Sequence, residues 1–199
     1  MRHIIGLTVL SLFLAAWPAP SARAGEPAAW VVDPAHCSVN FTIRHIYVQV
    51  PGQFQRFDAV VRFDPDNLAD SSVAMTVDVA SINTWVGKRD EDLRSPEFFD
   101  TAKYPSITFV SESITRQDAT TFVAKGKLTI KDVTREVELP FSYFGSKESP
   151  LMKGKTVAGF ESHFPVKLAD YHVGDDKWQK LGALGDSAEL SVYLELLRQ

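Results

Sequence analysis

The sequence predicts an all-β protein: an antiparallel barrel of about eight strands with a short helical segment near residues 88–103. Three observations predict this fold. Apolar and polar residues alternate in successive runs, turn residues separate most runs by short intervals, and helical patterning is nearly confined to that one segment. Because helices and strands do not alternate along the chain, a parallel α/β sheet is not expected.

Regularly spaced antiparallel strands would fit either a barrel or a sandwich. The barrel is favoured because the predicted inward faces combine Phe and Val with small residues, which leave room inside. An eight-stranded barrel can hold one small ligand. The small inward residues are Ala59, Ala124, Gly126, Ala158 and Ser162.

The first 24 of the 199 residues predict a secretory signal peptide. A short basic start is followed by the apolar run at residues 4–17 and by the cleavage pattern Ala22-Arg23-Ala24. An uncleaved membrane anchor is the weaker alternative, since the run is short for a bilayer and prolines follow it. We therefore expect an exported, periplasmic protein in which residues 25–199 form a single domain.

Composition narrows the partners of this domain. The formal net charge is −4, so neither nucleic acid nor an anionic membrane surface is an expected partner. Cys37 is the single cysteine, which excludes a disulfide within the chain. No second apolar segment is long enough to span a bilayer, so stable membrane insertion is not expected.

The strands follow from the alternation itself. After an opening at residues 30–32, Phe41 and Ile43 share one face of a run while Thr42 and Arg44 share the other. Turn chemistry separates later runs, for example at residues 64–67 and at Lys131-Asp132. The expected strands lie at residues 37–45, 56–63, 72–79, 106–111, 122–131, 137–143, 158–166 and 189–196.

One charged segment, residues 89–110, interrupts this pattern. Ser95-Pro96-Glu97 predicts a helix start, because Ser caps free N–H groups, Pro fits the first turn and Glu suits the positive end of the helix dipole. Phe98 and Phe99 follow directly, and Tyr104-Pro105 forces extended backbone. The segment is interpreted either as a lid over one end of the barrel or as a plain crossover connection.

Catalytic and metal patterns are weak. His36 and Cys37 are neighbours on a strand and point to opposite faces, so a buried, inert thiol is favoured. The histidines lack zinc-site spacing, so no metal is expected. His45 ends an apolar inward face, where it needs a partner: a neighbouring carboxylate or the polar end of a ligand.

Several ordered motifs resemble the YceI-like family. The first is Asp33-Pro34-Ala35-His36 with Arg44-His45 downstream, the second is Gly52-Gln53-Phe54, and the most specific joins Arg89-Asp90, Phe98-Phe99-Asp100 and Tyr104-Pro105. Residues 126–137 match the hairpin that follows. The resemblance runs from about Trp30 to the C-terminus. It departs from the family pattern at Cys37, at Asp132, and at residues 166–172, where an arginine is missing and His172 replaces a glycine.

The resemblance implies a lipocalin-like barrel that binds a polyisoprenoid or similar long amphiphile, in proteins that are exported and often dimeric. We therefore expect a carrier for a polyisoprenoid, an isoprenoid quinone or a fatty-acid-like lipid, with no cofactor and with a possible homodimer. A cavity enzyme, such as an isomerase or quinone-linked catalyst, and an interaction module with Phe98-Phe99 at a dimer surface are the alternatives. The expected ligand-binding residues are Phe41, Ile43, His45, Phe63, Val77, Arg89, Asp90, Phe98, Phe99, Phe109, Leu128 and Phe141.

Overall fold

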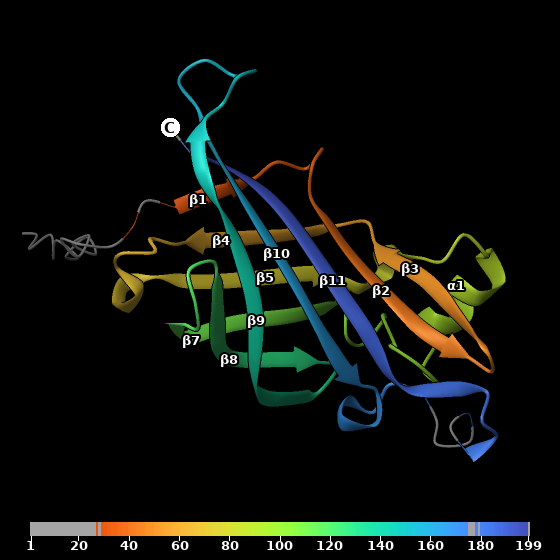
Figure 1. Cartoon of the computed structure of the whole chain (residues 1–199). Helices are drawn as coiled ribbons and strands as arrows, with labels where there is room; N and C mark the ends of the chain where they lie inside the picture. The colour runs from red at the N-terminus through yellow and green to blue at the C-terminus, as the bar shows by residue number, and fades with distance from the viewer. Residues whose placement is uncertain (1–26, 28, 175–177, 179, 199) are drawn as a thin grey trace, which may run out of the picture.

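The computed structural model describes residues 27, 29–174, 178 and 180–198. The predicted signal peptide lies outside these residues. Strands make up most of the described chain, which also contains the α-helix α1 and three single 3-10 turns (Figure 1). The strands are β1 Ala29–Val32, β2 Ser38–His45, β3 Val48–Phe54, β4 Phe57–Arg62, β5 Ser72–Asp78, β6 Ile82–Asn83, β7 Ser106–Arg116, β8 Thr121–Ile130, β9 Val133–Glu148, β10 Thr156–Lys167 and β11 Leu184–Arg198, and the helix is α1 Gly87–Arg94.

Eight strands close into a ring. Their order is β1-β4-β5-β7-β8-β9-β10-β11, and pairing of β1 with β11 completes the circle. Every pairing in the ring is antiparallel, which confirms the predicted eight-stranded antiparallel barrel. Closure leaves no free edge at the β1–β11 seam.

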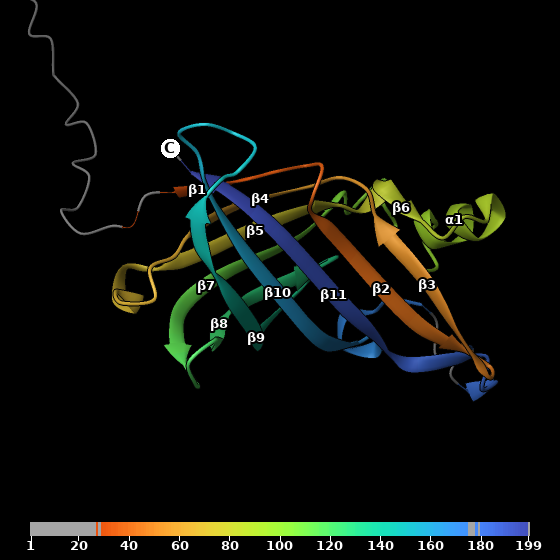
Figure 2. The same ribbon diagram turned by 45° about the horizontal axis from the view of Figure 1, so that its top comes forward.

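The remaining strands extend the wall beyond the ring. β11 is long enough to pair with β1 at Leu196–Leu197 and with β2 over Leu184–Tyr193. β2 then pairs with β3, and β3 with β6 (Figure 2). β1 and β2 thus lie one after the other along the same edge of β11, separated by the bend at residues 33–37.

The core lies inside the ring and is built from aromatic rings. Phe63 is 2% exposed, and its ring contacts four others edge-on at centroid distances of 5.0–5.5 Å. These partners are Phe122, Phe141, Tyr143 and Phe160. A second cluster, which includes Phe41, Phe54 and Ile82, fills the space under the extension.

Two of the predicted small inward residues serve close packing instead of a cavity. A Cβ atom on Gly126 would lie 2.2 Å from the carbonyl oxygen of Val110, so β7 and β8 can approach there only with glycine. Ala158 is buried in the core. Ala59, Ala124 and Ser162 do line the central cavity.

The helix begins earlier than predicted. α1 covers Gly87–Arg94, and Ser95 ends it: the Ser95 N–H and hydroxyl both donate to the carbonyl oxygen of Asp92. The prediction that Ser95-Pro96-Glu97 begins a helix is therefore wrong. The reason is that Ser95 binds a carbonyl of the preceding turn, while the start of α1 is held by Asp90, whose carboxylate accepts from Thr84.

Candidate functional site

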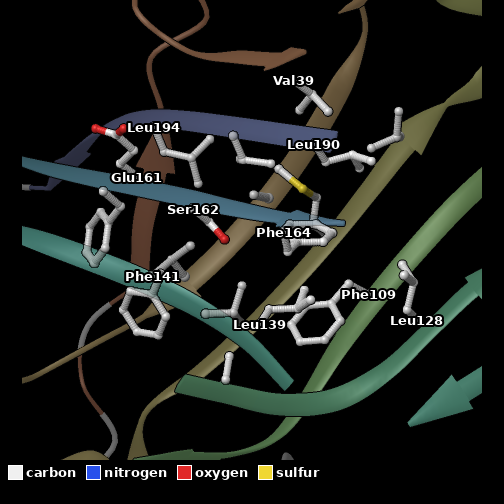
Figure 3. A pocket seen from close by; sticks show the side chains of 18 of the residues that line it. Val39, Phe109, Leu128, Leu139, Phe141, Glu161, Ser162, Phe164, Leu190 and Leu194 are labelled. Atoms are coloured by element: carbon white, nitrogen blue, oxygen red, sulfur yellow. The ribbon is translucent and has the colours of Figure 1, made fainter. Parts of the chain in front are cut away.

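A cavity lies inside the barrel, with a volume of about 120 Å³. Its wall is apolar except at Glu161 and Ser162 (Figure 3). Every ring strand except β1 contributes lining residues, and β2 adds one more. The lining residues are Val39, Ala59, Val61, Phe63, Val73, Met75, Val77, Ile107, Phe109, Ala124, Leu128, Leu139, Phe141, Phe160, Glu161, Ser162, Phe164, Leu190, Val192 and Leu194.

Strand geometry explains this wall. Residues at every second position of a strand face the same side, so Val73, Met75 and Val77 of β5 all reach the cavity. Glu161 and Ser162 are the polar exceptions among the lining residues. The Ser162 hydroxyl donates to the carbonyl oxygen of Pro140 at 2.6 Å, and Glu161 pairs with His163. Both polar groups are therefore satisfied by protein atoms, which leaves an apolar interior.

Five of the predicted ligand-binding residues line the cavity. They are Phe63, Val77, Phe109, Leu128 and Phe141. Phe41 lies outside the lining, in the second cluster, where its ring occupies the space over Gly52. Ile43 packs against the main core from its rim. Their positions on β2 place them in the extension instead of the ring.

His45 does not occupy the buried inward position expected of it. It is exposed at the end of β2, opposite Val48, where the β2–β3 hairpin reaches beyond the ring. The alternation of β2 continues to this residue, but the core does not extend that far. Its need for a buried partner therefore disappears.

Arg89 and Asp90 hold the chain before α1. The Thr84 N–H and hydroxyl donate to the buried Asp90 carboxylate at 2.8 and 2.5 Å. Arg89 donates from Nε to the Thr84 hydroxyl and from NH2 to the Thr84 carbonyl oxygen. Both side chains are engaged by one threonine and neither is among the lining residues, so the structure gives them a structural role.

Phe98 and Phe99 point to different places. The Phe99 ring packs edge-on against Phe54, with centroids 6.1 Å apart, and touches both core clusters. Phe98 stacks on Trp178, with centroids 6.4 Å apart. Phe99 thus lies at the junction of the barrel and its extension, while Phe98 anchors the segment to Trp178, which precedes β11. Neither ring is exposed, so an exposed dimer surface made of these two rings is not what the structure shows.

None of the predicted ligand-binding residues lies on β10 or β11, yet both strands contribute to the cavity wall. Phe160, Phe164, Leu190 and Leu194 belong to alternating runs that were recognised as strands. The alternation could have found them, because each shares a face with residues assigned to the core. The prediction instead favoured residues of the family motifs, which cluster nearer the N-terminus and the α1 segment.

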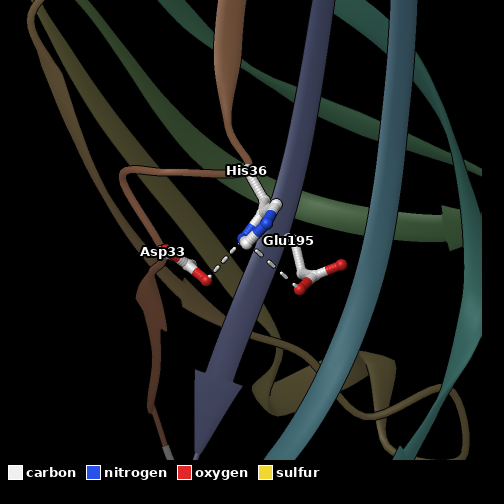
Figure 4. A group of neighbouring side chains, drawn as sticks. All are labelled: Asp33, His36 and Glu195. Carbon is white, nitrogen blue, oxygen red and sulfur yellow. Dashed lines mark hydrogen bonds and ion pairs between the residues drawn. The ribbon is translucent and has the colours of Figure 1, made fainter. Parts of the chain in front are cut away.

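A polar cluster lies at the bend between β1 and β2 (Figure 4). His36 Nδ1 is 2.9 Å from Asp33 Oδ2 and 3.9 Å from Glu195 Oε1 of β11. The Asp33 carboxylate raises the pKa of His36, and the hydrogen bond from His36 lowers the pKa of Asp33. These three groups are of metal-ligating types and lie within 4.8 Å of one another, and His36 is paired with both carboxylates.

Cys37 completes the same bend on the other face of the chain. Its Sγ donates to the Glu195 carbonyl oxygen at 3.1 Å and accepts from the Glu195 N–H at 3.2 Å. Glu195 falls between the stretches of β11 that pair with β1 and β2. Its carbonyl oxygen also accepts from the Asp33 N–H at 3.1 Å, so the thiol supplies the partner that the Glu195 N–H would otherwise lack. Burial raises the pKa of Cys37, which disfavours the reactive thiolate.

Comparison with known proteins places this barrel in a family. The model of the YceI-like domain matches residues 30–196. The chain belongs to the YceI-like family. The protein YceI of Escherichia coli is 33% identical over 201 residues, which cover 100% of this chain and 98% of that protein.

Solved YceI-like and related structures share the fold. BcnA of Burkholderia cenocepacia aligns with a TM-score of 0.75 at 27% identity, covering 84% of this chain and 99% of that chain. A polyisoprenoid-binding domain from Saccharophagus degradans aligns with a TM-score of 0.59 over 86% of this chain and 98% of that chain. At 15% identity the latter shows a common fold alone. Within the described part of the chain, no helix has the length and apolarity needed to cross a membrane.

Proposed function

We propose that this protein is an exported carrier that holds the apolar chain of an amphiphile inside its barrel. The ligand would be a polyisoprenoid, an isoprenoid quinone or a fatty-acid-like lipid. The largely apolar cavity wall is the observation that carries this proposal, because its only polar lining side chains, Glu161 and Ser162, are already paired with protein groups.

Burial of the chain would supply the binding free energy. Each Å² of apolar surface removed from water contributes about 25 cal/mol. The cavity of about 120 Å³ is smaller than the roughly 300–1,000 Å³ typical of ligand pockets. A long chain must therefore displace lining side chains or widen the wall, and flexible residues such as Met75 and Leu194 are suited to that rearrangement.

Two further observations support the proposal. The Saccharophagus degradans domain of the same fold is described as polyisoprenoid-binding, so this architecture is compatible with such a ligand. The basic start, apolar run and Ala-x-Ala pattern of the first 24 residues support export to the periplasm. A carrier in that compartment would keep an apolar chain out of water.

We also propose that the protein forms a homodimer. The outer face of the barrel carries a stripe of directly paired residues on four neighbouring strands: Val31, Val60, Ala74 and Val110. Val31 is 63% exposed and Val110 53%. An uncharged, apolar stripe of this kind suits a two-fold contact with a second copy. Light scattering of the wild type and of Val60→Lys tests it: a monomeric wild type would refute the dimer.

Ligand binding is tested with a cavity-filling variant. We would measure binding of a farnesyl, a ubiquinone and a palmitoyl probe to delipidated protein, alongside native mass spectrometry of the protein as purified. Ala124→Phe places a ring in the cavity and should weaken binding at least about tenfold, whereas Thr76→Phe, at an exposed position of β5 outside the proposed dimer stripe, should not. Absence of binding of all three probes to the wild type would refute the proposal.

A further inference from the structure

The barrel wall is incompletely paired between β9 and β10. The ladder joins Thr156–Glu161 of β10 to Ser142–Glu148 of β9 and ends there. The other half of each strand remains paired on its far side, residues 133–141 with β8 and residues 162–167 with β11. Figures 1 and 2 show the two strands close together at one end and spread apart at the other. The ring is thus closed in strand order but has a wedge-shaped gap.

A groove of about 780 Å³ occupies this gap. Consecutive residues line it: 134–140 of β9 and 163–167 of β10. Successive strand residues point to opposite faces of a sheet, so a groove on one face would be lined by alternate residues. Lining by consecutive residues shows that the groove runs along the two strand edges, through the thickness of the wall.

The groove and the internal cavity share a partition. Leu128, Leu139 and Phe164 line both spaces. Leu139 comes from one edge of the gap and Phe164 from the other, so these two side chains stand between the outside and the barrel interior. Side chains can change rotamer without breaking a hydrogen-bond ladder, so this part of the wall can open without loss of backbone pairing.

Both ends of the gap are fixed. At the paired end, the Ser162 hydroxyl donates to the Pro140 carbonyl oxygen at 2.6 Å. At the wide end, Arg135 of β9 donates to the carbonyl oxygen of Asp170, in the turn after β10, at 2.9 Å. Lys131 donates to the carbonyl oxygen of His172 beside it at 2.6 Å. Hydrogen bonds therefore hold the two ends of the gap, whereas its centre is filled by side chains alone.

The gap is poorly suited to an added strand from another protein. Pro140 faces β10 through its carbonyl group and has no N–H to donate there. Exposed charges at Glu136, Glu138 and Lys167 oppose edge-to-edge pairing. An apolar chain that needs no backbone partners is the occupant that fits, since the gap leads directly to the apolar cavity.

We propose that the gap between β9 and β10 is a lateral portal through which the apolar chain of the ligand enters and leaves the barrel, with Leu139 and Phe164 as its gate. This inference rests on the proposed function. It also accounts for the small volume of the cavity, because a chain longer than the cavity can extend through the gate into the groove.

Reversible cross-linking across the gap tests the portal. In a Cys37→Ser background, Glu136→Cys and Lys167→Cys place thiols on the two edges, to be joined by a bis-maleimide whose spacer contains a disulfide. Glu148→Cys and Thr156→Cys form the matched control, because these residues are already paired on the same strands. Association and release of a dansyl-labelled farnesyl probe are followed by stopped-flow fluorescence.

We expect the Glu136–Lys167 cross-link to slow association and release by about tenfold or more while Kd changes by less than about threefold, because a gate alters both rates together. Reduction of the spacer should restore both rates, and the Glu148–Thr156 cross-link should leave them unchanged. Phe164→Ala should accelerate both rates, unlike Leu194→Ala, which lines the cavity but not the groove.

Two results would overturn the portal in distinguishable ways. If the cross-linked protein still binds and releases the probe at wild-type rates, the portal is elsewhere and the proposed function stands. If the protein without a cross-link does not bind the probe, nor quinone nor fatty-acid probes, the proposed function fails and the portal fails with it.

Discussion

Asp90 is the buried charge on which the α1 segment depends. Asp90 is 7% exposed, and its carboxylate accepts two hydrogen bonds from Thr84. The sequence analysis included Asp90, which belongs to a family motif, among the expected ligand-binding residues. In the structure, the Asp90 carboxylate accepts hydrogen bonds from a buried N–H and a buried hydroxyl. Its place in the motif is therefore explained by a role in the fold.

We predict that Asp90→Ala destabilises the protein by about 2–3 kcal/mol, because both Thr84 donors lose their acceptor in a buried place. Urea unfolding monitored by circular dichroism measures the change. Glu91→Ala, an exposed carboxylate on the same helix, is the control and should stay within about 0.5 kcal/mol of the wild type. Equal effects of the two substitutions would contradict the structural role.

Phe63 links the core to the cavity, since its ring contacts four aromatic neighbours and lines the internal space. We predict that Phe63→Ala costs about 3–5 kcal/mol of unfolding free energy, through lost burial and an enlarged cavity. Phe144→Ala, which removes an exposed ring, should cost about 0.5 kcal/mol or less. Denaturant midpoints of the two variants and the wild type measure both changes in unfolding free energy. A small effect of Phe63→Ala would show that the interior is loosely packed.

At the scale of elements, the bend at residues 33–37 lets one long strand serve two partners. The His36–Asp33 pair and the contact with Glu195 fasten this bend to β11. The sequence signalled the bend through Asp33-Pro34, and the family motif marked His36. The role of His36 in holding the bend to β11 could be seen only in the tertiary structure, because residue 195 is far from it in the sequence.

The pH dependence of this fastener follows from its two shifted pKa values. The raised pKa of His36 contributes stability that is present below the ordinary value of 6.5 and is lost as pH rises through the folded-state pKa. The lowered pKa of Asp33 contributes stability that is present above 3.8 and is lost as pH falls through its folded-state pKa. The two contributions coexist between these ordinary values.

We therefore predict that the difference in Tm between wild type and His36→Gln is largest between about pH 4 and pH 6.5 and shrinks above and below that window. NMR titration of the His36 ring gives its pKa directly. Asp33→Asn should lower that pKa, whereas a substitution far from the bend, such as Glu138→Gln, should leave it unchanged. A difference in Tm that stays constant from pH 5 to pH 9 would contradict the pairing.

At the scale of the whole molecule, the proposed carrier function predicts that ligand binding stabilises the folded barrel. A ligand that binds only the folded state adds about 2.7 kcal/mol when its free concentration is a hundred times Kd. For a domain of this size, that corresponds to a rise of roughly 5–10 °C in Tm. We predict such a rise when a farnesyl or quinone probe is added to delipidated protein, and its absence in Ala124→Phe. Differential scanning calorimetry measures both.

The sequence by itself determined the fold class and most of the ring. Alternation with a period of two is a local property, and each strand carries it whether or not its partner is known. The same property identified Phe63, Val77, Phe109, Leu128 and Phe141 as inward-facing, and these five line the cavity. The YceI-like motifs added the family, because their order and spacing extend over nearly the whole predicted domain.

Only the tertiary structure decided where the barrel ends and where its wall opens. His45 follows the inward alternation of β2 yet is exposed, because the core stops before the hairpin does. Phe98 and Phe99 are sequence neighbours with different partners, since the turn after α1 directs one ring to Trp178 and the other to Phe54. The gap between β9 and β10 also depends on long-range geometry. Both strands show regular alternation, but their pairing with each other depends on the positions of β8 and β11, with which each is paired on its other side. No local sequence pattern predicts those positions.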